Sequence, residues 1–408
     1  MNNQEARKKL EQYGQEHVFQ YYDELSDRER NELIEQIERV DMEVLSLCEQ
    51  KDKLQKKGKI TPLAAMQLDE IEKNRQYYFN MGCSALKNGK IGAVLLAGGM
   101  GTRLGSDDPK GMYNIGITRE IYIFERIIQN LFDVVEQIGT YIHLFIMTSD
   151  KNHEQTTRFF EEKNYFGYNR EYITFFKQDM APAVDYQGKI LMESKSKMST
   201  SPNGNGGWFT SIIRNGLLNK IHKKGIEFLN VFAVDNVLQR IADPIFIGAV
   251  LEKNCAVGAK VVRKAAPDEK VGVMCLEDGK PSIVEYYELT EELRDAKDED
   301  GNPVYNFGVI LNYLFRVKDL EEIASKKMPF HIVKKAVPYI NEKGAFIKPE
   351  APNGYKFEAL VLDMIHMMDS CLPFEVVRNR EFAPIKNKTG VDSVESARAL
   401  LKENGVDL

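Results

Sequence analysis

The chain has 408 residues, of which 43% are hydrophobic, so it can form a large buried core. Its 61 acidic and 55 basic residues give a formal net charge of -6, which excludes a global positive field that would attract nucleic acid or an anionic membrane. The five cysteines are Cys48, Cys83, Cys255, Cys275 and Cys371. They never show CxxC spacing, so we expect reduced thiols instead of a disulfide framework or a structural zinc site. No apolar run reaches the roughly 18 residues of a membrane span, and we expect a cytoplasmic protein.

The predicted elements begin with a helical N-terminal region over residues 1–88. Leu33, Ile34, Ile37 and Val40 recur at helical spacing on a charged background. Residues 26–29 have the form of a capping box, and residues 61–62 place a threonine before a proline; both patterns predict helix starts.

From residue 91 onward, short apolar runs alternate with polar stretches. We predict buried strands over residues 91–97, 143–148, 172–176 and 228–234, whose apolar density is typical of parallel strands covered on both faces. We also predict an antiparallel hairpin, formed by residues 271–276 and 282–287. A helix over 358–368 and a strand over 374–377 follow. The expected organisation is an α/β catalytic core over 89–348 and a C-terminal segment over 349–408.

A glycine-rich turn follows the first predicted strand and carries the strongest functional signal. Residues 93–105 read AVLLAGGMGTRLG, and Lys110 follows soon after. Glycines allow backbone N–H groups to approach a phosphate, while Arg103 and Lys110 could neutralise its charge. A Walker A loop would need Gly-Lys-Ser/Thr, and the dinucleotide fingerprint fails because Gly105 comes one position too late. A purely structural glycine turn is the remaining alternative.

Two further polar residues follow predicted strands. Gln178 could present a donor and an acceptor to the edge of a bound nucleobase, or it could simply hydrogen-bond a loop. Asp235 follows the strand at 228–234, where α/β sheets place ligands and where a carboxylate suits Mg²⁺. The alternative for Asp235 is a helix N-cap, although Asp243, before Pro244, fits that role better.

The glycine-rich string resembles the signature of the UDP-sugar pyrophosphorylases, and most closely the UDP-N-acetylglucosamine pyrophosphorylase branch. The resemblance continues, in the family's order, at residues 175–178 (FFKQ), 202–207 (PNGNGG), 234–236 (VDN), 242–244 (ADP), 271–273 (VGV), 284–286 (VEY) and 381–387 (EFAPIKN). It therefore covers about residues 90 to 390.

The resemblance implies a Rossmann-like, mostly parallel nucleotidyltransferase core of the glycosyltransferase A type. It also implies a Mg²⁺-dependent uridylyltransferase that joins UTP to a sugar 1-phosphate, N-acetylglucosamine 1-phosphate before others, and that releases pyrophosphate and a UDP-sugar. It assigns Arg103, Lys110 and Lys386 to the phosphates and Asp235 to the metal. It makes Gln178 the uracil reader. The residues that it assigns to other substrate contacts are Gly98, Gly99, Asn205, Gly206, Gly272 and Glu285.

The sequence departs from this family on the sugar side. Where the family has a Gly-Asn-Ile-x-Asn-His stretch, Val309 replaces the first asparagine and Tyr313 the histidine. Tyr287 also stands where the family commonly has a serine. Glucose 1-phosphate and galactose 1-phosphate therefore remain alternative substrates. Two more functional classes are a non-catalytic UDP-sugar sensor and a Rossmann oxidoreductase; the intact cations oppose the first and the glycine spacing opposes the second.

Overall fold

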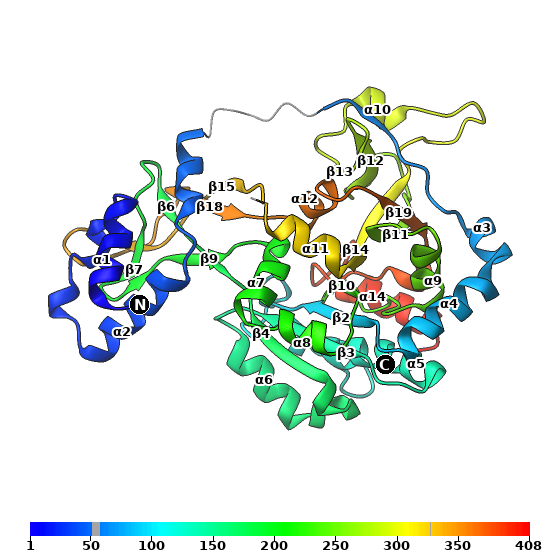
Figure 1. The fold of residues 1–408 in the computed structure, drawn as a ribbon, viewed down its shortest axis with the longest axis horizontal. Coiled ribbons are helices and arrows are strands. Elements are labelled where there is room, and N and C mark those ends of the chain that lie inside the picture. Colours follow the sequence, from blue (N-terminus) through cyan, green and yellow to red (C-terminus); the bar gives the residue numbers. More distant parts are fainter. Residues whose placement is uncertain (51–57, 327) are drawn as a thin grey trace. The chain divides into compact units, whose positions relative to one another are not determined.

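The computed structural model describes residues 1–50, 58–326 and 328–408, which divide into two compact units (Figure 1). The described part of the accessory unit consists of residues 1–50, 178–210 and 328–363, and that of the sheet unit of residues 58–177, 211–326 and 364–408. This division differs from the expected borders at residues 88 and 348, because each unit is assembled from three separate stretches of chain.

A mixed sheet forms the centre of the sheet unit and contains ten strands among the described residues. Its strands are β1 (Ile60–Pro62), β2 (Ile91–Leu96), β3 (His143–Thr148), β4 (Ile173–Lys177), β10 (Phe228–Ala233), β11 (Val257–Arg263), β12 (Val273–Glu277), β13 (Lys280–Val284), β14 (Phe307–Arg316) and β19 (Cys371–Glu375). The path runs β1-β12-β14-β10-β2-β3-β4, while β11 joins β14 to β19 and β13 pairs with β12. The predicted α/β class is confirmed.

Four strands of this sheet, β10, β2, β3 and β4, run parallel and were predicted to within one or two residues at their ends. Every residue of β2 is buried, as two-sided helix cover requires. In register, Leu96 of β2 lies opposite Met147 of β3 and Ala233 of β10. The loops after β2, β3 and β10 therefore leave the same edge of the sheet.

Helices pack around this sheet (Figure 1). They are α3 (Leu68–Lys73), α4 (Arg75–Lys87), α5 (Ile123–Ile138), α6 (His153–Glu162), α8 (Leu218–Lys223), α9 (Pro244–Glu252), α10 (Glu291–Asp295), α11 (Val317–Ala324), α13 (Arg378–Glu381) and α14 (Val394–Glu403). Helices α4 and α9 meet backbone to backbone: a Cβ on Gly82 would lie 1.9 Å from the Pro244 carbonyl oxygen, and one on Gly248 would lie 1.9 Å from that of Tyr78. Asp243 caps α9, as predicted.

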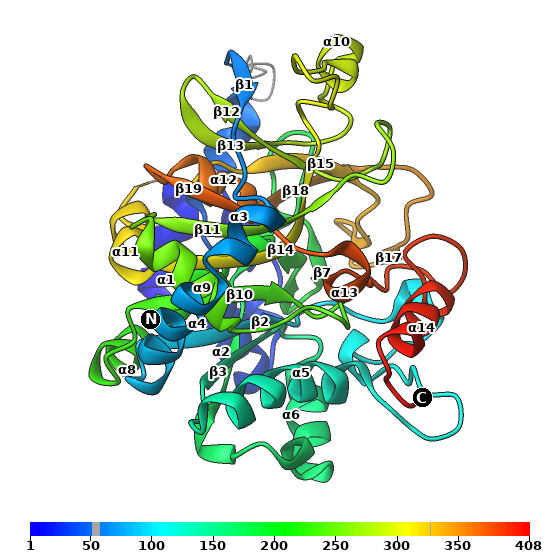
Figure 2. The ribbon, with the colours of Figure 1, turned by 90° about the vertical axis from the view of Figure 1, so that its right-hand side faces the viewer.

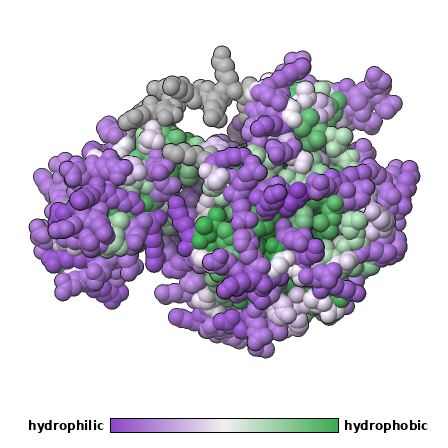
Figure 3. All heavy atoms as spheres, in the orientation of Figure 1, coloured by the Kyte–Doolittle hydropathy of each residue, from purple (hydrophilic) through white to green (hydrophobic). Residues whose placement is uncertain are grey.

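The accessory unit combines N-terminal helices with short strands. Its elements are α1 (Asn3–Gln12), α2 (Asp27–Arg39), β5 (Met180–Pro182), β6 (Val184–Asp185), β7 (Met192–Ser194), β8 (Lys197–Met198), β9 (Thr200–Pro202), β15 (His331–Lys335), β16 (Tyr339–Ile340), β17 (Phe346–Ile347) and β18 (Gly354–Glu358). Helices α7 (Trp208–Arg214) and α12 (Val361–His366) each contain a border between the units. Leu33 and Ile37 of α2 belong to a core that includes Phe357 of β18, whereas the viewed face of α1 and α2 is mostly hydrophilic (Figure 3).

Of the two helix starts predicted from local sequence, one forms and the other does not. The capping box at Ser26 forms and starts α2. Thr61-Pro62 does not start a helix, because these residues pair as β1 with β12. The predicted hairpin forms as β12 and β13, but β13 ends at Val284. Within the described ranges, no helix is both long and apolar enough to cross a bilayer.

Candidate functional site

The glycine turn after β2 is held open by its neighbours. Gly99 is exposed, and a Cβ placed on it would have no neighbour within 4 Å. Its carbonyl oxygen accepts hydrogen bonds from the Lys110 N–H at 3.1 Å and from Asn152 Nδ2 at 3.4 Å. Gly98, directly before it, is half-buried. The turn therefore offers open backbone at the sheet edge, as a phosphate- or base-binding loop requires.

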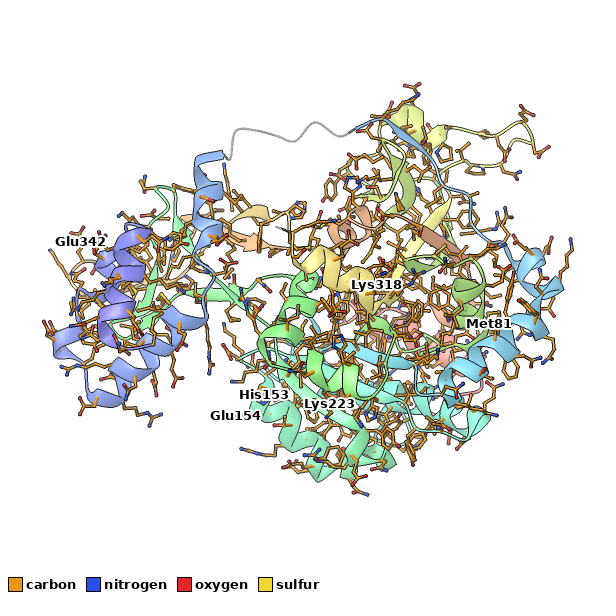
Figure 4. The ribbon with its side chains drawn as sticks, viewed as in Figure 1. Met81, His153, Glu154, Lys223, Lys318 and Glu342 are labelled. Carbon is orange, nitrogen blue, oxygen red and sulfur yellow. The ribbon has the colours of Figure 1, made fainter. Side chains whose placement is uncertain are left out.

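Asn152, which the sequence analysis did not single out, fixes this turn from the neighbouring strand. It is completely buried, and its Nδ2 donates to the Ala97 carbonyl at 2.9 Å while its Oδ1 accepts from the Ser149 N–H at 2.7 Å. The next residue, His153, begins α6 (Figure 4), and its Nδ1 lies 2.7 Å from Thr148 Oγ1. A single asparagine after a strand looks like an ordinary loop residue in sequence, so no local signal marked this role.

The structure brings the four predicted phosphate and metal residues of the sheet unit together. Lys110 Nζ lies 3.8 Å from Asp235 Oδ2, and both side chains are largely buried, at 12% and 23% exposure. Burial lowers the pKa of Lys110; the nearby positive charges of Arg103 and Lys386 lower it further, while Asp235 opposes the shift. Arg103, Lys110 and Lys386 bring three positive charges close to two carboxylates, Asp235 and Asp392, and a bound polyanion would neutralise the excess of positive charge.

The C-terminal stretch that carries Lys386 is attached directly to the loop of Asp235. Ile385 donates its N–H to the Asp235 carbonyl at 2.9 Å. Asn236, which is 1% exposed, donates from Nδ2 to the Glu381 carbonyl at 2.8 Å and accepts at Oδ1 from the Ala383 N–H at 2.9 Å. In the sequence, Asn236 stands out only as the last residue of the VDN motif, and no local pattern predicts the positioning role that it has in the structure.

Lys386 itself is held at the rim of the cluster. Its Nζ pairs with Asp392 Oδ2 at 2.9 Å, and its side chain is 40% exposed. The backbone N–H of Lys386 also donates to the Asp392 carbonyl at 2.7 Å. The lysine therefore has a local partner, and a bound phosphate would have to compete with one partly exposed carboxylate.

The single carboxylate of Asp235 suits a Mg²⁺ ion whose other ligands are substrate phosphates and water. Asp235 offers one hard carboxylate, and no group of three or more histidine, cysteine, aspartate or glutamate side chains within the described ranges could hold a metal. Mg²⁺ commonly binds one or two carboxylates together with substrate phosphates and water. The residues present therefore fit a magnesium ion that arrives with a nucleotide, but not a dedicated protein cage.

The predicted sugar-side residues Gly272 and Glu285 also lie together. A Cβ on Gly272 would be 3.6 Å from Glu285 Oε1 and 3.5 Å from Val309 Cγ2, and the Val309 N–H donates to the Gly272 carbonyl at 2.9 Å. Glu285 follows the end of β13 and is not in the strand, contrary to expectation. Of the two departures in the Gly-Asn-Ile-x-Asn-His stretch, Val309 lies at this group, whereas Tyr313 is 1% exposed within the core. Of these two residues, Val309 is thus the one that can affect a sugar.

The remaining predicted residues belong to the accessory unit. Gln178 directly follows β4 and is 7% exposed. Asn205 Oδ1 accepts the Val361 N–H at 3.0 Å, and Gly206 donates its N–H to the Ala359 carbonyl at 2.9 Å. A Cβ on Gly206 would lie 2.6 Å from the Leu360 backbone, so this glycine is required for close packing. Both Asn205 and Gly206 thus have structural tasks beside the substrate contacts predicted for them.

The five cysteines are thiols outside disulfides, as expected from their spacing. Cys48 and Cys275 are buried, and burial raises the pKa of Cys83, Cys255 and Cys371. Thiols whose pKa lies above its usual value hold little thiolate near neutral pH. Cys83, Cys255 and Cys371 are therefore expected to react little as nucleophiles, and Cys48 and Cys275 belong to the buried core.

Comparison with known proteins agrees with this geometry. UDP-N-acetylglucosamine pyrophosphorylase of Saccharomyces cerevisiae is 36% identical, and the match covers 94% of this chain and 86% of the yeast protein. UDP-N-acetylglucosamine diphosphorylase 2 of Arabidopsis thaliana is also 36% identical, with 96% and 82% covered. The crystal structure of uridine diphosphate N-acetylglucosamine pyrophosphorylase from Trypanosoma brucei superposes with a TM-score of 0.82 at 28% identity, over 97% of this chain and 83% of that one.

These likenesses confirm the predicted nucleotidyltransferase fold and extend over almost the whole chain. The family model described as UTP–glucose-1-phosphate uridylyltransferase matches residues 34–407. The chain belongs to the UTP–glucose-1-phosphate uridylyltransferase family.

Proposed function

We propose that this protein joins UTP to N-acetylglucosamine 1-phosphate and releases pyrophosphate and UDP-N-acetylglucosamine. The observation that carries the proposal is the cluster of Arg103, Lys110 and Lys386 around Asp235, next to an open glycine turn. The names of the yeast and Arabidopsis relatives support the choice of sugar.

The reaction is an in-line displacement at phosphorus. An oxygen of the sugar 1-phosphate forms a bond to the α-phosphorus of UTP, and the bond from that phosphorus to the bridging oxygen of pyrophosphate breaks. The sugar phosphate is already ionised at neutral pH, so neither a protein nucleophile nor a general base is needed. The protein has to align two anions that repel each other and to neutralise the leaving group.

The side chains of the cation cluster suit this task. Lys110 is largely buried, and burial lowers its pKa, with further lowering by the positive charges of Arg103 and Lys386 against the opposing effect of Asp235. A bound triphosphate would supply negative charge and would favour the protonated lysine. Arg103 is exposed and Lys386 half-buried, so both can rearrange around a substrate. Such groups typically contribute several kcal/mol each to transition-state stabilisation.

Asp235 would hold Mg²⁺ in this proposal. When bound, the ion would neutralise phosphate charge and help to orient the substrates. Asp235 emerges from the end of β10, beside the glycine turn, and its backbone carbonyl is tied to Ile385. The protein itself therefore keeps the carboxylate at the sheet edge.

We further propose that Gln178 reads the uracil edge through its amide, which offers both a donor and an acceptor. Its place directly after β4 and its low exposure support this role. Further contacts to the nucleotide and the sugar would come from Gly98, Gly99, Asn205 and Gly206.

One observation favours a second candidate substrate. Val309 places an apolar side chain beside Gly272 and Glu285, where the family pattern has asparagine. A site that lacks this amide discriminates less strongly by hydrogen bonding. Glucose 1-phosphate is therefore the second candidate.

The test is a pyrophosphate-release assay with UTP and a panel of N-acetylglucosamine, glucose and galactose 1-phosphates, with Mg²⁺ and with EDTA. We expect the highest kcat/KM with N-acetylglucosamine 1-phosphate and activity only with Mg²⁺. Binding of UDP-sugar without pyrophosphate release from any of the three would refute the enzymatic proposal and favour a sensor.

A further inference from the structure

A cavity of about 480 Å³ with both charged and apolar lining residues lies in the sheet unit, apart from the cation cluster. Its walls come from α3, α5, α13, β19 and the loop after β10, and none of Arg103, Lys110, Asp235 or Lys386 lines it. This volume falls within the range of about 300–1,000 Å³ that is typical of small-molecule sites. The cavity can therefore admit a ligand of metabolite size.

Most of the carboxylates in the cavity wall already have a close cation. Lys260 Nζ, which is fully buried, lies 3.1 Å from Asp243 Oδ2 and 2.5 Å from Glu381 Oε2. Arg263 Nε lies 2.7 Å from Glu375 Oε1. Neither Lys260 nor Arg263 lines the cavity, so these two cations lie behind the wall and offset two of the three negative charges. One negative charge, shared between Asp243 and Glu381, is left beside the interior.

Two arginines of the wall have weaker compensation. Arg380 donates from Nη1 to Asn404 Oδ1 at 3.2 Å, and Arg240 donates from Nη2 to Gln137 Oε1 at 3.2 Å. Both acceptors are neutral amides. Arg240 also forms a long ion pair of 3.7 Å with Asp243, which shares the single charge of Lys260 with Glu381. In Figure 2, α13, which carries Arg380, lies beside α14 near the C-terminus.

Arg126 is the least compensated cation of the wall. Its side chain is 14% exposed, and its ion pair with Asp133 spans 4.0 Å. Its Nε is buried without a hydrogen-bond partner among the described residues, and burial lowers the pKa of the guanidinium. A buried charge without a close partner is costly, and a bound anion would remove that cost. A fourth arginine, Arg75, already pairs with Glu72 at 3.3 Å.

We propose that this cavity binds a phosphate monoester through Arg126, Arg240 and Arg380. Planar guanidinium groups match the oxygens of a phosphate and form paired, charge-assisted hydrogen bonds with them. The apolar side chains of Ile71, Leu238 and Phe374 also line the cavity and suit the carbon skeleton of such a ligand.

A ligand in this cavity would contact the stretch that leads to Lys386. Arg380 and Glu381 line the wall, and the backbone of Glu381 accepts the hydrogen bond of Asn236, next to Asp235. Occupancy of the cavity is therefore expected to stabilise the segment that delivers Lys386. This links the second site physically to the cation cluster.

The test locates the anion directly and uses inorganic phosphate and tungstate as probes. Crystals soaked in tungstate are expected to show an anomalous peak in the cavity, whatever binds at the cation cluster. In solution at constant ionic strength, saturating phosphate is expected to raise the unfolding temperature. We expect Arg126→Gln and Arg380→Gln to lose at least half of that rise, and the control Arg158→Gln, an exposed arginine on α6, to keep it.

Three results would overturn the proposal. The first is a cavity without tungstate in crystals that show peaks elsewhere. The second is a full phosphate-dependent rise in both arginine variants, and the third is an equal cavity peak in those variants, which marks an adventitious ion only. Arg380 is exposed, so Arg380→Gln keeps the test decisive if Arg126→Gln does not fold. None of these results depends on whether UTP is the substrate.

Discussion

Replacing Asn236 with alanine tests whether the C-terminal stretch is positioned for catalysis by one side chain. The substitution removes the bond from Nδ2 to the Glu381 carbonyl, at 2.8 Å, and the bond from the Ala383 N–H to Oδ1, at 2.9 Å. Each buried backbone group that loses its partner costs about 1–3 kcal/mol. We therefore expect the variant to lose roughly 2–6 kcal/mol of stability at this segment.

The expected kinetic effect follows from the position of Lys386. Asn236 pairs with residues 381 and 383, and Lys386 lies three residues after the second of these. If the tether loosens, the lysine samples positions away from the phosphates, and a displacement of about 1 Å can lower turnover about 100-fold. We expect kcat in the pyrophosphate-release assay to fall about 10- to 100-fold, with a smaller change in the KM for UTP.

A double-mutant cycle separates this role from a general loss of stability. If Asn236 acts through Lys386, Asn236→Ala should add little to the defect of Lys386→Ala. Asn353→Ala is a matched control, because Asn353 also bridges backbone groups: its Oδ1 accepts the Val337 N–H at 2.7 Å and its Nδ2 donates to the Val337 carbonyl at 3.0 Å. The control should lose stability but keep kcat. Fully additive defects of Asn236→Ala and Lys386→Ala would refute the reasoning.

Four further predictions concern single residues. Lys110→Met should lower kcat about 100- to 1,000-fold with an unchanged circular dichroism spectrum; near-normal turnover would remove Lys110 from the site. Gln178→Ala should reduce the preference for UTP over CTP, measured as a ratio of kcat/KM values, by about 10- to 100-fold, and an unchanged ratio would exclude uracil reading. Val309→Asn should change the KM for sugar 1-phosphates several-fold and leave that for UTP alone, whereas equal changes in both would place Val309 away from the sugar. Burial lowers the pKa of His143 from 6.5 to about 4, so the unfolded chain binds a proton at a higher pH than the folded protein does. The free energy of unfolding therefore falls as pH is lowered from about 6.5 towards 4. His143→Gln should reduce that loss, measured by urea unfolding at several pH values.

The sequence by itself determined the parallel strands of the sheet and the cations next to the glycine turn. Residues 91–96 are apolar throughout, and a run of this kind is stable only as a strand covered on both faces, which is what β2 is. Because β2, β3 and β10 end at one edge, Gly99 and Asp235 had to emerge near each other once the strands were recognised.

Only the tertiary structure decided the contacts that depend on partners far away in the chain. Thr61-Pro62 has the local pattern of a helix start, yet pairing with β12 makes it a strand, because tertiary pairing outweighs a weak local preference. The two-unit division depends on packing between residues such as Leu33 and Phe357, which no local pattern links. Asn152 and Asn236 gain their roles from the backbone groups of other segments, and the cavity around Arg126 is lined by elements from distant parts of the chain. Side-chain type is a local property, whereas a hydrogen-bond partner or a charge balance is set by the fold.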